Sequence, residues 1–151
     1  MAEYTIKEVS EMFSLPASTL RYYEEIGILT NIPRNSSGNR VYQECHIARL
    51  RTICCFKNTG MSMAQLQAFF SYECSNEDHV EDIIRLLAEH KDSLAKKIEQ
   101  LQRDYIHVQR KLHFYQDIKK SRETQMQPPV WEDYKYQTFA ENEGDGADGR
   151  S

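Results

Sequence analysis

The sequence has no long apolar run, and it contains only six glycines, four prolines and four cysteines among 151 residues. No stretch approaches the roughly 20 consecutive apolar residues that a membrane-spanning helix requires. The N-terminus, MAEYTIKEVSEMF, lacks the basic and then apolar pattern of a secretion signal. We therefore expect a cytoplasmic protein that makes no contact with a membrane.

The four cysteines, Cys45, Cys54, Cys55 and Cys74, do not include a CxxC pair. In a cytoplasmic chain they are expected to be reduced thiols, and their spacing argues against a structural zinc site. The sequence also lacks a nucleophile elbow, a phosphate-binding loop and an HExxH motif. We therefore expect no enzyme activity, no cofactor and no bound metal.

The net charge of −4 argues at first against a polyanionic partner, but the charge is unevenly distributed. Residues 1–72 carry seven basic and six acidic side chains, whereas residues 121–151 carry three and seven. The acidity therefore comes mainly from the C-terminal part, and the N-terminal region is compatible with nucleic acid as a partner.

Two short helices joined by a turn are predicted near the N-terminus. Thr5 and Glu8 have the spacing of a capping box that opens the first helix, and Pro16 interrupts the helical pattern. Ser18 is placed to cap a second helix, which ends at Gly27. This pattern is typical of a helix-turn-helix motif.

A short two-stranded wing is predicted next, because the turn-forming residues 36–39 lie between Arg34 and Arg40. Hydroxyl, phenol and guanidinium groups at a helix start and on a wing are suited to contact bases and phosphates. From the residues alone, DNA contacts are expected from Ser18, Thr19, Arg21, Tyr22, Arg34, Asn35, Arg40 and Tyr42. The alternative is that the arginines are solvated charges paired with nearby glutamates such as Glu24.

Three more helices are predicted after the wing. The first runs from Glu44 to about Asn58, and the second opens with a capping box of Ser62 and Gln65. The third spans residues 80–120, and its apolar residues are spaced alternately three and four apart. A narrow stripe of this length needs a partner helix, most simply the same helix of a second copy, although the helix could instead fold back on its own domain. The predicted dimer contacts are Leu87, Leu94, Ile98, Leu101, Tyr105, Val108 and Leu112.

Residues 121–151 form an acidic tail that we expect to be mostly disordered, above all from Glu141 onwards. Four aromatic residues interrupt it: Trp131, Tyr134, Tyr136 and Phe139. They either dock on the folded part of the chain or form an aromatic patch in a mobile tail.

Residues 4 to about 70 resemble the MerR family of bacterial transcription regulators. The resemblance rests on TLRYYEEIGIL at residues 19–29 and on RNSSGNRVY at residues 34–42. The segment CFKNTG at residues 55–60 further resembles the AdhR/NmlR-like branch, which is associated with reactive aldehydes and with nitrosative or thiol stress. The chain departs from the family at His46, where an acidic residue is usual, and at Gln43, where Ser, Thr or Asp usually caps the helix.

The resemblance implies a mainly α fold with four parts. These are a winged helix-turn-helix DNA-binding domain at residues 1–72, a linker at 73–79, a dimerisation helix at 80–120 and the tail at 121–151. The dimerisation helix is expected to form an antiparallel coiled coil with a second copy.

The resemblance also implies how the protein acts on DNA. Arg21 should reach the DNA from the recognition helix, and one or both of Tyr22 and Tyr23 should touch its phosphate backbone. Arg34, Arg40 and Tyr42 correspond to wing residues that hold flanking phosphates. Dimers of this kind bend and untwist promoters with an overlong spacer so that RNA polymerase can use them. The expected partners are double-stranded promoter DNA in the nucleoid, a second copy of the chain, and RNA polymerase.

The expected signal acts on a thiol, and Cys55 is favoured over Cys54. A cysteine reacts as its thiolate, which a cation such as Arg51 or Lys57 would favour. The alternatives are that these cysteines only fill the core, or that the effector is a metal ion or a small molecule. A coiled-coil adaptor without DNA binding is a further alternative, but it leaves the basic wing unexplained.

Overall fold

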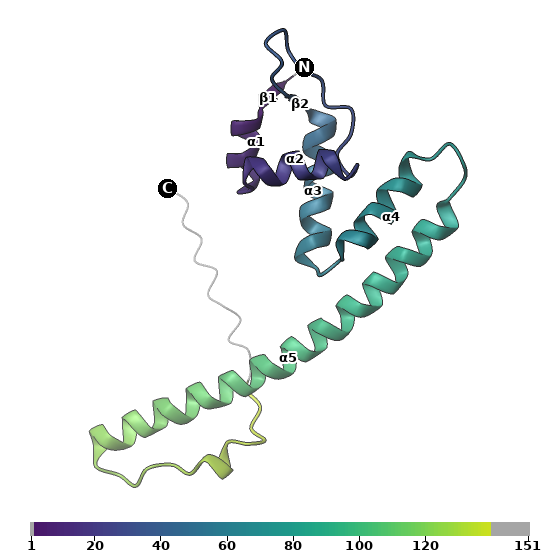
Figure 1. The fold of residues 1–151 in the computed structure, drawn as a ribbon. Coiled ribbons are helices and arrows are strands. Elements are labelled where there is room, and N and C mark those ends of the chain that lie inside the picture. Colours follow the sequence, from purple (N-terminus) through teal and green to yellow (C-terminus); the bar gives the residue numbers. More distant parts are fainter. Residues whose placement is uncertain (1, 140–151) are drawn as a thin grey trace, which may run out of the picture. The chain divides into compact units, whose positions relative to one another are not determined.

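The computed structural model describes residues 2–139 and is mainly helical, which confirms the predicted fold class (Figure 1). These residues form two compact units, which divide between Leu94 and Ala95 within one long helix. The first unit holds β1 (Glu3–Thr5), α1 (Ile6–Phe13), α2 (Ala17–Glu25), β2 (Val41–Gln43), α3 (Glu44–Asn58), α4 (Met63–Cys74) and the start of α5 (Val80–Thr124). The second unit holds the rest of α5 and a 3-10 turn, η1 (Trp131–Asp133).

The predicted capping boxes are present at the starts of α1 and α4. The Glu8 carboxylate accepts a hydrogen bond from the Thr5 backbone N–H at 2.7 Å, and the Glu8 N–H donates to the Thr5 hydroxyl at 3.3 Å. Ser62 and Gln65 make the same reciprocal pair, with distances of 2.9 and 3.2 Å. Each box satisfies two of the backbone N–H groups that a helix start leaves without an intrahelical partner.

The prediction that Ser18 caps the second helix is wrong. Helix α2 already begins at Ala17, with Pro16 as the N-cap and no side-chain cap. The Pro16 carbonyl accepts from the N–H groups of Thr19 and Leu20 at 2.9 and 3.3 Å, so the chain turns into the helix before Ser18 is reached. The Ser18 side chain is exposed and is left available for other contacts.

The C-terminal end of α2 is the turn that the sequence predicts. Gly27 has a φ of +81°, the Ile28 N–H donates to the Tyr23 carbonyl at 3.1 Å, and the Gly27 N–H donates to the Glu24 carbonyl at 3.2 Å. This is a Schellman motif, in which glycine adopts the left-handed conformation at little steric cost. It directs Ile28 and Leu29 into the core, where both are fully buried.

The wing is formed as predicted at its tip, but its strand pairs elsewhere. Arg34 and Arg40 form an isolated antiparallel bridge, and the Asn35 side-chain oxygen accepts from the N–H groups of Ser37 and Asn39 at 3.0 and 2.9 Å. Strand β2 then pairs antiparallel with β1, with Tyr4 opposite Tyr42. Strand β1 was not predicted from the sequence, because three residues that end at a helix cap are too few to show an alternating pattern.

The core of the first unit is built from α1 to α4 and closed by the start of α5. Leu20, Ile47, Leu50, Ile53 and Leu66 are among its fully or almost fully buried residues. Three residues of α5 pack against this cluster, namely Ile83, Leu86 and Leu87. The predicted dimer contact Leu87 therefore lies, half-buried, against the core of its own chain.

In the second unit, the segment after α5 packs back on the helix. Trp131 meets Phe114 edge-on at 5.5 Å between ring centroids, and Tyr134 meets the same ring at 5.2 Å. The Phe139 ring stacks on His113 at 3.8 Å, and the Arg110 guanidinium donates to the Gln137 carbonyl at 2.8 Å. Of the two alternatives for the aromatic residues, docking is therefore the one observed for Trp131, Tyr134 and Phe139, while Tyr136 is 87% exposed. The disorder expected from Glu141 onwards lies outside the described residues.

The apolar stripe of α5 remains exposed in the second unit. Ile98, Leu101, Tyr105, Val108, Leu112 and Tyr115 are each between 49% and 66% exposed. Within residues 2–139, no helix is both long and apolar enough to cross a membrane.

The docking of Tyr134 should depend on pH, because its hydroxyl must keep its proton to donate to the Asp117 carboxylate at 2.5 Å. This hydrogen bond, together with burial, raises the pKa of Tyr134 from 10.0 to about 12. A raised pKa means that the docked state favours the protonated form. The stabilisation that this hydrogen bond gives to the docked state is therefore fully present below pH 10 and is lost as the pH rises through about 12.

Trp131 is the only tryptophan in the sequence and reports on this transition. We expect its emission to shift to longer wavelength over the same pH range, as its ring leaves Phe114 and becomes hydrated. The Tyr134→Phe variant cannot ionise at this position and should lack the transition. A transition of unchanged size in that variant would contradict the assignment.

Candidate nucleic-acid interface

The rotation of α2 about its axis decides which of its side chains face outwards. Leu20 and Tyr23 are buried in the core, whereas Ser18, Arg21 and Tyr22 are exposed. Neighbouring residues on a helix point about 100° apart, so adjacent tyrosines cannot share a side. Tyr22 is 45% exposed and Tyr23 is 1% exposed, so the pair divides between surface and core.

The hydroxyl of Tyr23 is engaged inside the protein. It accepts a hydrogen bond from the Lys57 ammonium at 2.9 Å, and this ammonium lies 5.5 Å from the centre of the Tyr23 ring. The bond ties α2 to the last turn of α3. Tyr23 therefore does not present its hydroxyl to a phosphate, and of the two tyrosines only Tyr22 lies at the surface.

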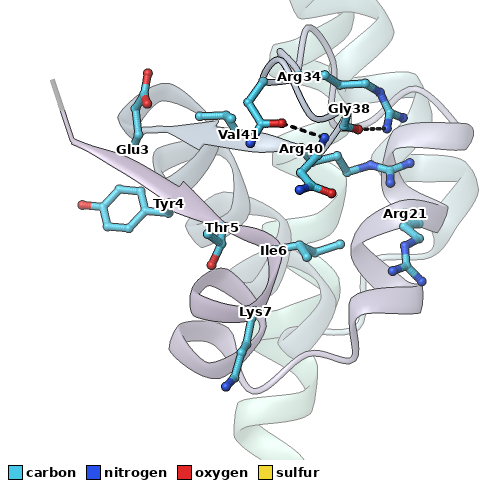
Figure 2. Close-up of a pocket in the computed structure, with 12 residues that line it drawn as sticks. Glu3, Tyr4, Thr5, Ile6, Lys7, Arg21, Arg34, Gly38, Arg40 and Val41 are labelled. Carbon is cyan, nitrogen blue, oxygen red and sulfur yellow. Dashed lines mark hydrogen bonds between the residues drawn. The ribbon is translucent and has the colours of Figure 1, made fainter.

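A hollow of about 570 Å³ lies between the N-terminal strand, α1, α2 and the wing (Figure 2). Four of its lining residues are cationic, namely Lys7, Arg21, Arg34 and Arg40, and one is anionic, Glu3. In Figure 2 the three arginines lie along one side of the hollow, and the Lys7 side chain extends from α1 away from them. This concentration of positive charge is the electrostatic environment that a phosphate backbone requires.

Glu24 holds the two wing arginines, so the pairing that the sequence leaves as an alternative is present. Its carboxylate accepts from Arg40 Nε at 2.5 Å and lies 4.0 Å from a terminal nitrogen of Arg34. Arg34 also donates to the Gly38 carbonyl at 3.1 Å. Among the described residues Arg40 makes no other hydrogen bond, so its two terminal nitrogens remain as donors for an added anion.

Arg21 differs from the wing arginines because it makes no ion pair with any of the described residues. Its guanidinium lines the hollow from the exposed side of α2. Because Arg21 has no ion pair that must first be broken, its guanidinium can bind a phosphate or the edge of a base directly.

Tyr42 lies in a different environment from the one that its predicted role requires. Its side chain is fully buried, and its hydroxyl finds no hydrogen-bond partner among the described residues. Burial raises the pKa of Tyr42, and the charges nearest to it include those of Arg40 and Glu24. A phosphate contact from Tyr42 would require its hydroxyl to become accessible.

Two residues of this surface were not predicted from the sequence as part of it, namely Lys7 and Glu24. Lys7 lies in the first turn of α1 and lines the hollow. Its place two residues after the Thr5 cap and two before the buried Val9 puts it on the outer side of the helix, and this spacing could have identified it. From the sequence Glu24 is expected only to neutralise the charge of the arginines, but its ion pairs also position both wing arginines. Asn35, by contrast, is used to close the wing turn, and Thr19 is half-buried.

The departure of the chain from the family pattern at Gln43 and His46 has a structural explanation. The Gln43 N–H donates to His46 Nδ1 at 2.9 Å. The histidine ring therefore accepts the capping hydrogen bond that the usual acidic residue would accept at this position. The other ring nitrogen, Nε2, lies 3.2 Å from the Asn31 carbonyl oxygen. These two partners assign the neutral tautomer with its proton on Nε2.

Cys54 and Cys55 have different environments in the last turns of α3. Cys55 is exposed, whereas Cys54 is half-buried. Burial raises the pKa of the Cys54 thiol, and the nearby positive charge of Lys57 opposes this only in part. A higher pKa lowers the fraction of thiolate, so Cys54 is the less reactive of the two on this ground.

The turn after Cys55 is connected to α5. The Thr59 hydroxyl oxygen lies 3.1 Å from the Cys55 carbonyl oxygen and 2.7 Å from His90 Nε2. The His90 ring also lies edge-on to Phe56 at 6.5 Å. The end of α3 is therefore bonded to α2 through Lys57 and to α5 through Thr59.

Comparison with known proteins places this geometry in a family. Residues 4–73 match the family described as MerR HTH family regulatory protein, and residues 47–104 match the one described as MerR, DNA binding. An uncharacterized HTH-type transcriptional regulator of Haemophilus influenzae is 31% identical over 116 residues, which are 77% of this chain and 86% of that protein. The HTH-type transcriptional regulator AdhR of Bacillus subtilis is 33% identical over 91 residues, which are 60% of this chain and 65% of AdhR.

A solved structure shows the same fold. HiNmlR, a MerR family regulator lacking the sensor domain, was crystallised bound to promoter DNA. It superposes with a TM-score of 0.71 and 29% identity, over 83% of this chain and 97% of HiNmlR.

The helix-turn-helix, its basic face and these similarities define a DNA-binding regulator of transcription. The chain belongs to the MerR family. The resemblance to the MerR family is thereby confirmed, as is the prediction that the protein is a regulator and not an enzyme.

The two tyrosines of α2 should respond differently to loss of their hydroxyls. Tyr22→Phe should weaken DNA binding and leave the melting temperature unchanged, because the Tyr22 hydroxyl is at the surface. Tyr23→Phe should destabilise the unit by about 1 kcal/mol, since it removes one internal hydrogen bond to Lys57. Thermal unfolding followed by circular dichroism and titration of a fluorescent DNA duplex measure the two effects. The opposite result, with Tyr22→Phe lowering stability, would show that the assignment of the pair is reversed.

Proposed function

We propose that the protein binds promoter DNA as a homodimer and regulates transcription by deforming the promoter in response to aldehyde or thiol stress. The observation that carries the DNA-binding part is the basic hollow beside α2, in which Arg21 lacks an internal partner among the described residues. The similarity to HiNmlR, which binds promoter DNA, supports the same conclusion.

In this proposal α2 is the recognition helix. Its exposed side, with Ser18, Arg21 and Tyr22, enters the major groove, where a guanidinium can read a guanine or hold a phosphate. Arg34 and Arg40 bind flanking phosphates from the wing, and Glu24 keeps their guanidinium groups in place. Phosphate contacts of this kind fix the position of the protein on the duplex but carry little sequence information.

The homodimer is supported by the exposed apolar stripe of α5. An antiparallel coiled coil of two such helices would hold two recognition helices about one turn of DNA apart, roughly 34 Å. Binding at that spacing would bend and untwist a promoter whose spacer is overlong, so that RNA polymerase can engage it. Since the promoter is the target, we place the protein at the nucleoid, in the bacterial cytoplasm.

The proposed sensor is Cys55, which lies on the surface in the segment that resembles the AdhR/NmlR-like branch. The similarity to AdhR supports this branch. A change at Cys55 would act on a turn that is bonded to both α2 and α5, through Lys57 and Thr59. Chemistry at one thiol therefore has a short physical route to the recognition helix and to the dimerisation helix.

The DNA-binding proposal is tested by Arg21→Ala. The target is a duplex selected by the wild-type protein from a random-sequence pool, and affinity is measured at several salt concentrations. We expect a loss of about 1–3 kcal/mol in binding free energy, the range for a base-reading arginine. Arg85→Ala is the matched control, because Arg85 is an exposed arginine of α5 that does not line the hollow. Wild-type affinity of Arg21→Ala would reject the role given to α2.

The sensor proposal is tested by replacing each cysteine with serine in a transcription assay, with and without formaldehyde or diamide. We expect Cys55→Ser to abolish the response and Cys54→Ser to retain most of it, because Cys54 is half-buried with a raised pKa. Cys45→Ser is the control for an exposed thiol elsewhere on α3. A full response from the Cys54→Ser, Cys55→Ser double variant would end the thiol hypothesis while leaving DNA binding untouched.

A further inference from the structure

The segment after α5 packs on a second apolar face of this helix, separate from the exposed stripe. Successive residues of a helix are about 100° apart, which places Phe114 roughly 120° from Val108 and 160° from Leu112, and Ile118 roughly 80° and 120° from the same two residues. Helix α5 therefore carries apolar side chains on two sides along this part of its length. A helix that is apolar on two sides can recruit more than one partner helix.

The contacts of the C-terminal segment cover this second face. The Trp131 ring lies against His107 and Phe114, at 5.9 and 5.5 Å between centroids, and the Lys111 ammonium lies 3.6 Å from the centre of the indole. Tyr134 is 7% exposed and donates its hydroxyl to Asp117. Because aromatic, cation–π and hydrogen-bond contacts each have a preferred geometry, together they hold the C-terminal segment in one defined position on α5.

The same segment leaves the first face open. A groove of about 810 Å³ runs along the stripe and is lined by Ile98, Leu101, Tyr105 and Val108, with Phe139 at its border. Phe139 is held there by its stack on His113, so the segment marks the edge of the groove without filling it. The alternating spacing of the stripe fits a helix, and the same stripe on a second copy supplies that helix.

We infer that residues 126–139 are an intramolecular cover that limits the assembly to two chains. By burying the second apolar face, the cover leaves α5 with one exposed apolar side. When two chains join through this side, they form a symmetric dimer with no apolar side left for a third chain. This inference rests on the proposed homodimer, and it adds the element that prevents larger assemblies. It gives the aromatic residues of the C-terminal segment a function that DNA binding and sensing do not explain.

The experiment compares full-length variants by light scattering during size-exclusion chromatography at several concentrations. The wild type should keep the mass of two chains. The Trp131→Gln, Tyr134→Gln double variant should exceed that mass, increasingly so at higher concentration, because its second apolar face is uncovered. Tyr136→Gln is the matched control, since this ring belongs to the same segment but is 87% exposed, and it should behave as the wild type. Unchanged far-ultraviolet circular dichroism shows that the variants keep their helices.

A separate variant distinguishes this inference from the proposed homodimer. Leu101→Asp places a charge in the stripe and should give single chains, while the cover remains intact. If Leu101→Asp gives single chains but the double variant stays at two, the cover is rejected and the homodimer stands. A double variant that falls to single chains would also reject the cover, because the segment would then be part of the pair's own interface. If the wild type runs as single chains throughout, the homodimer itself is wrong.

Discussion

The burial of Tyr23 between α2 and α3 is the interaction on which the exposed side of α2 depends. The ring fills the core, its hydroxyl is bonded to Lys57, and its carbonyl accepts the first hydrogen bond of the Schellman turn from Ile28. With this residue held at both its side chain and its backbone, α2 cannot rotate about its axis. Arg21 and Tyr22 must then face outwards, because helix geometry separates neighbours by about 100°.

Helix α3 connects the parts of the first unit that act in the proposed mechanism. Its last turn and the residue that follows bond to α2 through Lys57 and to α5 through Thr59 and His90, and Cys55 lies on this turn. Its first turn is capped by Nδ1 of His46, and the other ring nitrogen of His46 is bonded to the Asn31 carbonyl. A helix that is anchored at both ends, with the exposed thiol of Cys55 near its connected end, suits the proposed role of passing a local change to α2 and α5.

In the second unit one apolar side of α5 is covered by the chain itself and another is left exposed. The C-terminal segment buries the face around Phe114, and the stripe around Leu101 stays open for a partner. The cost of ordering about a dozen residues is offset by several aromatic contacts and by the Tyr134 hydrogen bond to Asp117. In both units a packed aromatic residue therefore helps to fix which side of a helix is exposed, Tyr23 for α2 and Phe114 for α5.

Local signals in the sequence determined where most of the helices of the first unit begin and end. The capping boxes at Thr5 and Ser62, the stop at Gly27 and the bounds of α3 follow from residues close together in the chain, whose hydrogen bonds form within one turn. Tyr23 could be assigned to the core and Tyr22 to the surface for the same reason, since helical spacing alone separates them. The family pattern was readable because its residues lie in two short runs.

Only the tertiary structure decided the contacts between residues far apart in the chain. The pairing of β1 with β2, the bond from Lys57 to Tyr23, the burial of Tyr42 and the docking of Trp131 on Phe114 join segments whose separation leaves no periodic trace. Such contacts depend on how whole elements pack, and any one of them competes with hydration of the same groups. The sequence therefore determined which elements form and which of their sides are apolar, while packing decided which apolar side is covered and which is left for a partner.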